Sequence, residues 1–337
     1  MSTPLKRPAT LADVARFARV STAVVSYVIN DGPRPVAPAT AERVRQAVQI
    51  LGYRPNRHAQ ALMRGSVGIL GLIHPGTSNP FFGEFNDVLY RTAAAAGIGL
   101  LTATSAGNVK TERQLMESMA SRSLDGIIVT TSMVPADVPT LTDPGIPMVF
   151  LDCPFPIPGY TTIGPAASDG IRRLVDHLIT THGHRNIGFI AGDTGSADPE
   201  DRELGWRQAL QTHRLPTGPR IRTSFHLEGG YDGAKHLLDQ PDRPTAIVAS
   251  SDLQATGALH AIHEHGLRIP EDIAVTGFDG TRGTAHTWPP LTVVRQPMQA
   301  MAAAAISSFQ AEPSHTLYPM ELVTRRSCGC PTTAATT

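Results

Sequence analysis

The stretch TLADVARFARVSTAVVSYVIN, running from Thr10 to Asn30, decides the architecture of the N-terminal part of this 337-residue chain. Thr10 is followed three residues later by Asp13, a capping-box spacing that predicts the start of a helix. Apolar residues then recur at helical spacing and predict one buried face, formed by Leu11, Val14, Ala15 and Ala18.

A second helix is predicted directly after a short turn at Arg19 and Val20. Ser21 is a favourable N-cap for it. Three valines are spaced to face inward, so they predict core packing rather than DNA contact: Val24, Val25 and Val28. Two short helices joined by so tight a turn indicate a helix-turn-helix, whose second helix is built to enter a major groove.

The charge distribution supports this interpretation. The chain carries 29 Lys or Arg and 29 Asp or Glu, but residues 1–65 hold ten of the basic residues and only three of the acidic ones. The net charge of the whole chain is zero, but residues 1–65, the basic head, carry +7 and the remaining residues carry −7. Such asymmetry indicates a polyanionic partner for the head alone. A solvated basic surface is the alternative, and the helix spacing argues against it.

A third helix is predicted from Pro38, a favourable first-turn residue, to Leu51, with Gly52 ending it. Residues 1–52 would then form one three-helix domain. A fourth helix of about nine residues follows Arg54, too short to be stable alone in water. We expect residues 53–66 to be a linker that folds on DNA.

From residue 67 the pattern changes to apolar strands that alternate with helical stretches, which predicts parallel sheets covered by helices. The strands are expected at 67–73, 98–104, 127–130, 148–152, 187–191, 246–250 and 274–278. Helices are expected at 80–96, 112–122, 171–182, 202–212, 231–239 and 252–265. The fold class is therefore α/β, with an all-α head followed by two doubly wound lobes.

Composition excludes several classes of protein. No apolar stretch is long enough to span a bilayer, and the polar N-terminus predicts no signal peptide, so a cytoplasmic, nucleoid-associated protein is expected. The chain lacks GxGxxG after a strand, a P-loop, GxSxG and HExxH, which argues against an enzyme and against a bound cofactor. Cys328-Gly-Cys330 lacks the two-residue gap and the second ligand pair of zinc sites, so no metal is expected.

Motifs along nearly the whole chain resemble those of the lactose-repressor (LacI/GalR) family of bacterial transcription regulators. They are TLADVARFARVS, VSYVIN, ERVRQAVQILGYRPN, AQALMRG, NPFF, DGIIV, GHRNIGFIAGD, ASSDLQATGALHAIHEHGLRIPEDIAVTGFDG, PPLTVVRQP and ELVTRRSCGCP. The resemblance implies lobes like those of periplasmic binding proteins, with three chain crossings, which we place near residues 160, 288 and 320. The N-lobe would comprise 67–160 and 288–320, the C-lobe 161–287 and 321–330, with a tail at 331–337.

The resemblance also implies which residues contact DNA. Those matching family positions in the head are Thr10, Ser21, Thr22, Ala23, Ser26, Tyr27, Asn30 and Tyr53. Those in the hinge are Asn56, Ala59 and Leu62, of which Leu62 matches a leucine that wedges between base pairs in the minor groove. Tyr27 stands where many family members carry Arg, so the familiar contact to guanine is not carried over.

A small-molecule effector is expected between the lobes, at the carboxyl ends of the strands. The implied effector-binding residues are Asn79, Phe81, Phe82, Asp152, Arg202, Ser251, Asp279 and Gln296. Ser251, Glu228, Gly280 and Ala166 depart from residues common in relatives. These departures leave the effector open, with a sugar or sugar-like metabolite favoured.

The leading functional hypothesis is a ligand-responsive transcriptional regulator, most simply a repressor, that binds a palindromic operator as a homodimer. The tail lacks the leucine heptads of a tetramerising coiled coil, which favours a dimer. The alternative is a solute-binding protein of the periplasmic-binding fold with no transcriptional role. The absence of a predicted signal peptide and the basic head argue against that alternative.

Overall fold

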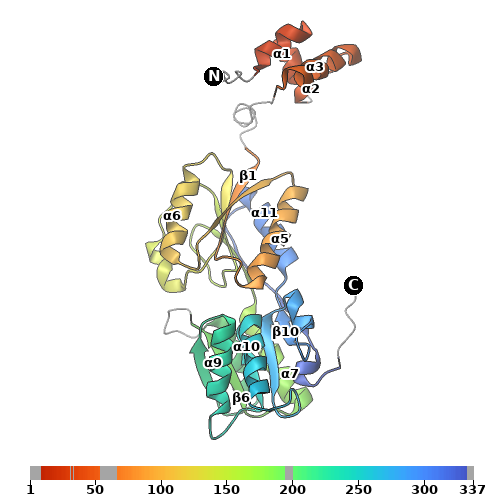
Figure 1. The fold of residues 1–337 in the computed structure, drawn as a ribbon. Helices are drawn as coiled ribbons and strands as arrows, with labels where there is room; N and C mark the ends of the chain where they lie inside the picture. Colours follow the sequence, from red (N-terminus) through yellow and green to blue (C-terminus); the bar gives the residue numbers. More distant parts are fainter. Residues whose placement is uncertain (1–8, 31, 33, 54–66, 194–199, 332–337) are drawn as a thin grey trace, which may run out of the picture. The chain divides into compact units, whose positions relative to one another are not determined.

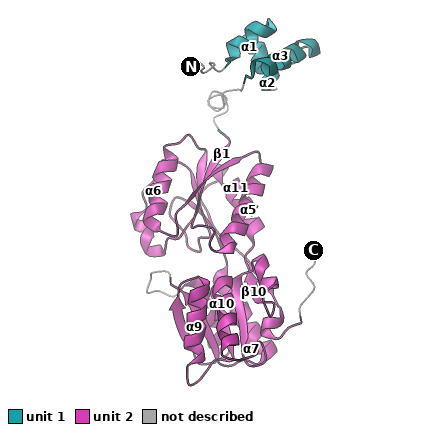
Figure 2. Cartoon of the chain, in the orientation of Figure 1, with its two compact units in different colours: residues 1–67 teal, residues 68–337 magenta. Residues whose placement is uncertain are grey.

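The computed structural model describes residues 9–30, 32, 34–53, 67–193 and 200–331. The chain divides into two compact units, residues 1–67 and 68–337 (Figure 2). Within the described ranges, no helix combines the length and the apolar composition that a membrane crossing requires. The predicted hinge helix, with Asn56, Ala59 and Leu62, lies outside the described residues, as does the tail from residue 332.

In its described residues the first unit contains the three helices predicted for 1–52, namely α1 (Leu11–Ala18), α2 (Thr22–Ile29) and α3 (Pro38–Leu51) (Figure 1). The capping box of α1 is present, and Arg19 ends the helix in the left-handed conformation (φ 52°), which makes the tight turn into α2. The three helices share one core, formed by Val14, Ala15, Ala18, Val25, Val44 and Ala47.

The second unit contains two six-stranded sheets, each the centre of one lobe. The first sheet is entirely parallel and has the order β11-β5-β4-β3-β1-β2. In chain order its strands are β1 (Ile69–His74), β2 (Gly99–Thr104), β3 (Gly126–Thr130), β4 (Met148–Leu151), β5 (Thr161–Pro165) and β11 (His315–Tyr318). Helices α5 (Pro80–Ala95) and α11 (Met298–Ser307) cover one face, and α6 (Val109–Ala120) covers the other (Figure 1).

The second sheet has the order β12-β10-β9-β8-β6-β7, and only the edge pair of β10 and β12 is antiparallel. Its strands are β6 (Ile187–Gly192), β7 (Arg220–Thr223), β8 (Ala246–Ala249), β9 (Ala274–Asp279), β10 (Thr292–Arg295) and β12 (Glu321–Val323). Helices α7 (Ala167–His182) and α8 (Asp201–Thr212) pack on one face, and α9 (Leu227–Leu238) and α10 (Asp252–Glu264) pack on the other. Every residue of the central strands β6, β8 and β9 is buried, as expected for strands covered on both faces.

Four short 3₁₀ segments complete the described secondary structure: η1 (Pro135–Thr140), η2 (Arg282–Ala285), η3 (Ser308–Gln310) and η4 (Arg326–Cys328).

The chain passes between the lobes at places that differ from two of the expected positions. β5 pairs with β4 and β11, so it belongs to the first sheet, and the first crossing follows residue 165 rather than 160. β10 pairs with β9 and β12, so the second crossing follows residue 295 rather than 288. The third crossing lies between β11 and β12, close to residue 320. These crossings lie five and seven residues beyond the expected positions because pairing with distant strands, which local composition does not reveal, decides which sheet a strand joins.

Candidate functional site

The N-terminal turn of α2 is the most exposed part of the helix-turn-helix. Ser21, Thr22 and Ala23 are exposed, while Val25, one turn further along the helix, is fully buried. The Ser21 hydroxyl accepts a hydrogen bond from the backbone N–H of Val24 at 3.3 Å, which is the predicted N-cap. The side chains at the start of α2 are therefore accessible to a partner molecule.

The other predicted DNA-contacting groups in the head are held by hydrogen bonds or packing. The Thr10 hydroxyl lies 2.6 Å from Asp13 Oδ2, and Asn30 Nδ2 donates to Ser26 Oγ at 3.2 Å. Tyr27 is half-buried, and Gly32 lies so close to its ring that an added Cβ would be only 2.6 Å from Tyr27 Cδ1.

Tyr53 packs against the core of the head just beyond the end of α3. Its burial raises the pKa of the phenol, which stays neutral at physiological pH. The ring therefore anchors the chain at the point where it leaves the three-helix domain.

A cavity of about 660 Å³ lies between the two lobes of the second unit. Its lining comes from the segments that directly follow β1, β2, β3 and β4 in one sheet and β6, β7, β8 and β9 in the other. Parallel strands bring their carboxyl ends to one edge of a sheet, so two such sheets facing each other place eight strand ends around one space. Seven of the eight predicted effector-binding residues line it: Asn79, Phe81, Phe82, Asp152, Arg202, Ser251 and Asp279.

The first lobe contributes an amide and an aromatic edge from the start of α5. Asn79 Oδ1 accepts from the backbone N–H of Phe81 at 3.0 Å and so caps the helix, which leaves the amide Nδ2 as the ligand-facing donor. Phe81 is 1% exposed and packs against Phe85, so most of its ring belongs to the core. Phe82, which is only half-buried, is the better stacking surface of the two.

The second lobe contributes a fixed cation. The Arg202 guanidinium carbon lies 4.1 Å from the centre of the Phe278 ring and 5.4 Å from that of Phe225. Arg202 Nη1 also donates to the Ser250 carbonyl at 2.7 Å. Stacking between aromatic faces restricts the planar guanidinium to one orientation, which suits it to hold a polar ligand group.

Two of the aspartates that line the cavity, Asp152 and Asp279, lie at strand ends. Asp152 and Asp279 both have positive φ values, 57° and 115°, conformations that are sparsely populated for residues other than glycine and that cluster at functional sites. Burial raises the pKa of Asp152 to about 6, with Arg202 opposing the shift. Burial, reinforced by the nearby carboxyl of Asp252, raises the pKa of Asp279 well above its usual value.

Two predicted residues play a different part from the one expected. The Ser251 hydroxyl donates to the Phe225 carbonyl at 3.1 Å and accepts from Gln254 N–H at 3.1 Å, so it caps α10 and supports the cavity wall. Gln296 is not among the lining residues. Its amide Nε2 instead donates to Asp279 Oδ1 at 2.9 Å, so it positions a carboxylate that does line the cavity.

The sequence did not predict the aromatic residue that the second lobe contributes to the cavity wall. Phe225 lines the cavity after β7, a strand that the sequence pattern did not predict. Its ring fills the space over Gly192, where a Cβ would lie 1.7 Å from Phe225 Cζ, so only glycine fits there. His226 and Asp193 also line the cavity, whereas Glu228 is exposed on α9.

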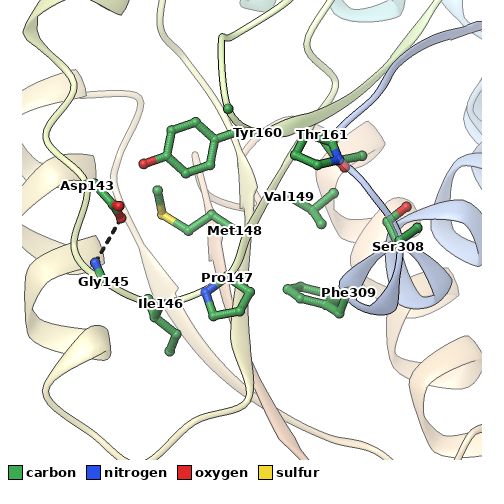
Figure 3. A pocket seen from close by; sticks show the side chains of 13 residues that line it. Asp143, Gly145, Ile146, Pro147, Met148, Val149, Tyr160, Thr161, Ser308 and Phe309 are labelled. Atoms are coloured by element: carbon green, nitrogen blue, oxygen red, sulfur yellow. Dashed lines mark hydrogen bonds between the residues drawn. The ribbon is translucent and has the colours of Figure 1, made fainter.

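A smaller hollow of about 430 Å³ lies on the first lobe, between the segment before β4 and η3 (Figure 3). Phe309, Pro147 and Met148 form much of its wall, and the labelled carboxyl, that of Asp143, accepts from Gly145 N–H at 2.9 Å within its own loop. It lies away from the strand ends that line the larger cavity. The cavity between the lobes, which gathers several polar groups, is therefore the stronger candidate for a ligand site.

Comparison with known proteins identifies both units. The model of the bacterial regulatory proteins of the lacI family matches residues 10–56, and that of a periplasmic binding protein-like domain matches residues 175–328. An uncharacterized HTH-type transcriptional regulator of Streptomyces limosus is 35% identical over 323 residues, covering 90% of this chain and 88% of that protein. The chain belongs to the LacI family.

Other LacI-family proteins match over a similar length. The ribose operon repressor of Haemophilus influenzae is 32% identical, with 89% of this chain and 91% of that protein covered. The lac repressor dimer bound to operator and an anti-inducer superposes with a TM-score of 0.86 at 26% identity, covering 96% of this chain and 99% of that one. A CelR–cellobiose complex superposes with a TM-score of 0.69 at 27% identity over 95% and 99% of the two chains.

This LacI-family chain is a ligand-responsive, DNA-binding transcriptional regulator. The predicted family, fold class and regulatory function are thus confirmed, and the alternative of a solute-binding protein is not favoured. The relatives are named as regulators and repressors rather than as enzymes.

Proposed function

We propose that this regulator is a repressor that binds a palindromic operator as a homodimer, and that a sugar or sugar-like effector in the cavity between its lobes controls operator affinity. The observation that carries the effector proposal is the convergence of Asp152, Asp279 and Arg202 with the aromatic rings of Phe82 and Phe225 on one cavity. Carboxylates accept hydrogen bonds from sugar hydroxyls, and aromatic faces stack on the apolar face of a pyranose.

In the proposed operator complex, α2 enters the major groove. Thr22, Ala23 and Tyr27 face the base edges, while Ser21, Ser26, Thr10 and Asn30 contact phosphates, which fix register without reading sequence. Tyr53 and Asn56 contact the backbone near the hinge. Ala59 and Leu62 belong to a hinge helix that enters the minor groove, where a leucine wedge would bend the duplex.

Regulation then requires that the ligand binds one lobe arrangement better than another, since a ligand shifts an equilibrium only by its differential affinity. The effector contacts both lobes, so its binding biases their relative orientation and with it the hinge. The same site binds its ligand without turnover. Recovery of chemically unchanged ligand after prolonged incubation with the protein is the expected result.

The proposal is tested by selecting bound DNA from a random duplex pool with the full-length protein. The expected result is an enriched palindrome, whose binding is then measured against a panel of mono- and disaccharides. Asp279→Asn serves as the matched variant, expected to keep operator binding and to lose the sugar response. Enrichment of no sequence, with or without the sugars, would overturn the operator proposal. Equal sugar responses of both proteins would overturn the assignment of the cavity.

A further inference from the structure

Two histidines and two cysteines converge at the far end of α7, away from the strand ends that line the cavity. His177 and His182 lie on α7, and Cys328 and Cys330 lie about 150 residues later, around η4. One ligand atom of each residue lies within 4.8 Å of those of the other three. The two Nε2 atoms are 3.2 Å apart, and Cys330 Sγ lies 3.4 Å from each of them.

These separations are those of the edges of a metal-centred tetrahedron. With typical Zn–N and Zn–S bond lengths, tetrahedral ligands lie about 3.3 Å apart for N and N and about 3.6 Å apart for N and S. The observed N–N distance is 3.2 Å, and the observed N–S distances are 3.4, 3.4 and 3.8 Å. Hydrogen bonds alone do not require four side-chain atoms to surround one point. Each hydrogen bond needs only one donor and one acceptor.

Groups around the four residues hold the ligand atoms in place. His177 Nδ1 lies 3.2 Å from the Thr181 hydroxyl, so its Nε2 faces the cluster, which is the usual outer-shell arrangement of a metal-binding histidine. The Thr292 hydroxyl lies 3.0 Å from Cys328 Sγ. Gly329 between the cysteines has φ +102°, and a Cβ there would lie 3.2 Å from the His182 ring. Glycine at this position therefore permits both cysteines to face the same histidines.

We propose that His177, His182, Cys328 and Cys330 bind one Zn²⁺ ion in a tetrahedral structural site. Two imidazoles and two thiolates with this geometry form the ligand set that selects zinc. Four protein ligands close the coordination shell, so the site has no open position for a substrate or for activated water. The ion would fasten the segment after β12 to the end of α7.

This proposal revises the expectation that the chain binds no metal. That expectation rested on the missing second ligand pair near Cys328-Gly-Cys330, and the structure supplies the pair from α7. The inference is independent of the proposed operator and effector. The alternative to zinc binding is a disulfide between Cys328 and Cys330, which would leave neither sulfur available as a thiolate ligand.

The test uses untagged full-length protein purified under reducing conditions. Elemental analysis is expected to find about one zinc per chain. After chelation and dialysis, Co²⁺ is expected to give the visible absorption bands of tetrahedral thiolate coordination, which zinc then removes. Cys330→Ser and His177→Gln are expected to weaken zinc binding by at least about 100-fold, since loss of even an outer-shell partner costs 10- to 100-fold.

Matched controls are available in the same lobe and the same chain. His184→Gln replaces a histidine whose ring packs against His182 but whose Nδ1 pairs with the Thr245 hydroxyl, and Cys153→Ser replaces the third cysteine, which lies in the other lobe. Both controls are expected to retain one zinc. Wild-type protein that takes up neither zinc nor cobalt overturns the proposal, whatever the variants do. So does a thiol count that finds Cys328 and Cys330 joined in protein purified without added oxidant.

Discussion

Gln296 Nε2 donates a 2.9 Å hydrogen bond to Asp279 Oδ1, and both side chains are buried. Asp279 ends β9, while Gln296 lies one residue past the end of β10, where the chain passes to the other lobe. A change in lobe orientation therefore acts on the segment that positions a cavity carboxylate. This contact links the proposed effector site to a crossover through a single side chain.

We expect Gln296→Met to weaken effector binding although the residue does not line the cavity. The variant removes the donor that holds the Asp279 carboxyl group, and leaving a buried acceptor without its partner costs about 1–3 kcal/mol. Isothermal titration should therefore show a loss of affinity of roughly fivefold or more. Gln240→Ala, a half-buried glutamine after α9 whose amide donates to the His236 carbonyl, is the control. Equal affinities for the two variants would contradict the positioning role.

The raised pKa of Asp152 predicts a pH-dependent stability of the ligand-free protein. Because burial raises this pKa to about 6, the folded state binds the proton more tightly than the unfolded state, whose pKa is about 3.9. Its contribution to the free energy of unfolding is therefore complete below about pH 4 and is lost as the pH rises through 6.

Asp152→Asn removes the ionisation and should flatten this dependence. The variant and the wild type are expected to have similar stability near pH 4, and the variant is expected to be more stable by about 1–2 kcal/mol at pH 7.5. Thermal unfolding between pH 4 and 8 measures the difference. Asp87→Asn, an exposed site on α5, should leave the pH profile unchanged. A variant less stable than wild type at pH 7.5 would refute the assignment.

Glu203 forms an ionic cluster outside the cavity that should be important for folding. Its carboxylate is fully buried and pairs with Arg207 at 2.7 Å, with Arg222 at 3.4 Å and with Arg220. Glu203→Gln removes the buried negative charge that these three arginines contact, so we expect a loss of about 3 kcal/mol in chemical denaturation. Asp169→Asn, whose ion pairs on α7 are exposed, should cost less than about 1 kcal/mol.

Thr22 should affect operator sequence preference rather than fold. It is exposed at the start of α2 and makes no cap, so Thr22→Ala is expected to relax selection at one base pair in each half-site. The expected cost for the preferred sequence is about 1–3 kcal/mol. Repeating the DNA selection with this variant, and with Gln49→Ala on α3 as control, measures the effect. An unchanged consensus would place Thr22 away from the bases.

Much of the fold was predictable because its signals are local. Capping at Thr10 and Ser21, the inward side of α2 at Val25 and Val28, and the ends of α3 all follow from neighbouring residues, whereas Val24 was expected in the core and does not belong to it. The strand ends at Asp152 and Asp279 followed from apolar runs that stop at a polar residue. These signals were sufficient to locate the cavity, since parallel strands bring their carboxyl ends together.

The remaining features depend on contacts between distant residues. Phe81 was expected at the ligand, but its neighbour Phe82 is the more exposed ring because the pitch of α5 turns Phe81 toward the core. Phe225 was missed because the short edge strand before it is only partly buried and carries no apolar run. The histidines that approach Cys328 and Cys330 lie on a helix that precedes them by about 150 residues, and no sequence spacing reveals that proximity.

The three crossings also determine when each lobe can finish folding during synthesis. The first sheet takes β11, and its covering helix α11, from residues made after nearly all of the second lobe. Residues 67–165 therefore leave the ribosome without their edge partner and with part of one apolar face uncovered. The usual order, in which an N-terminal domain folds first, cannot be completed here. The first lobe can therefore complete its sheet only after β11 has been synthesised. A chain truncated before residue 318 contains neither lobe in full.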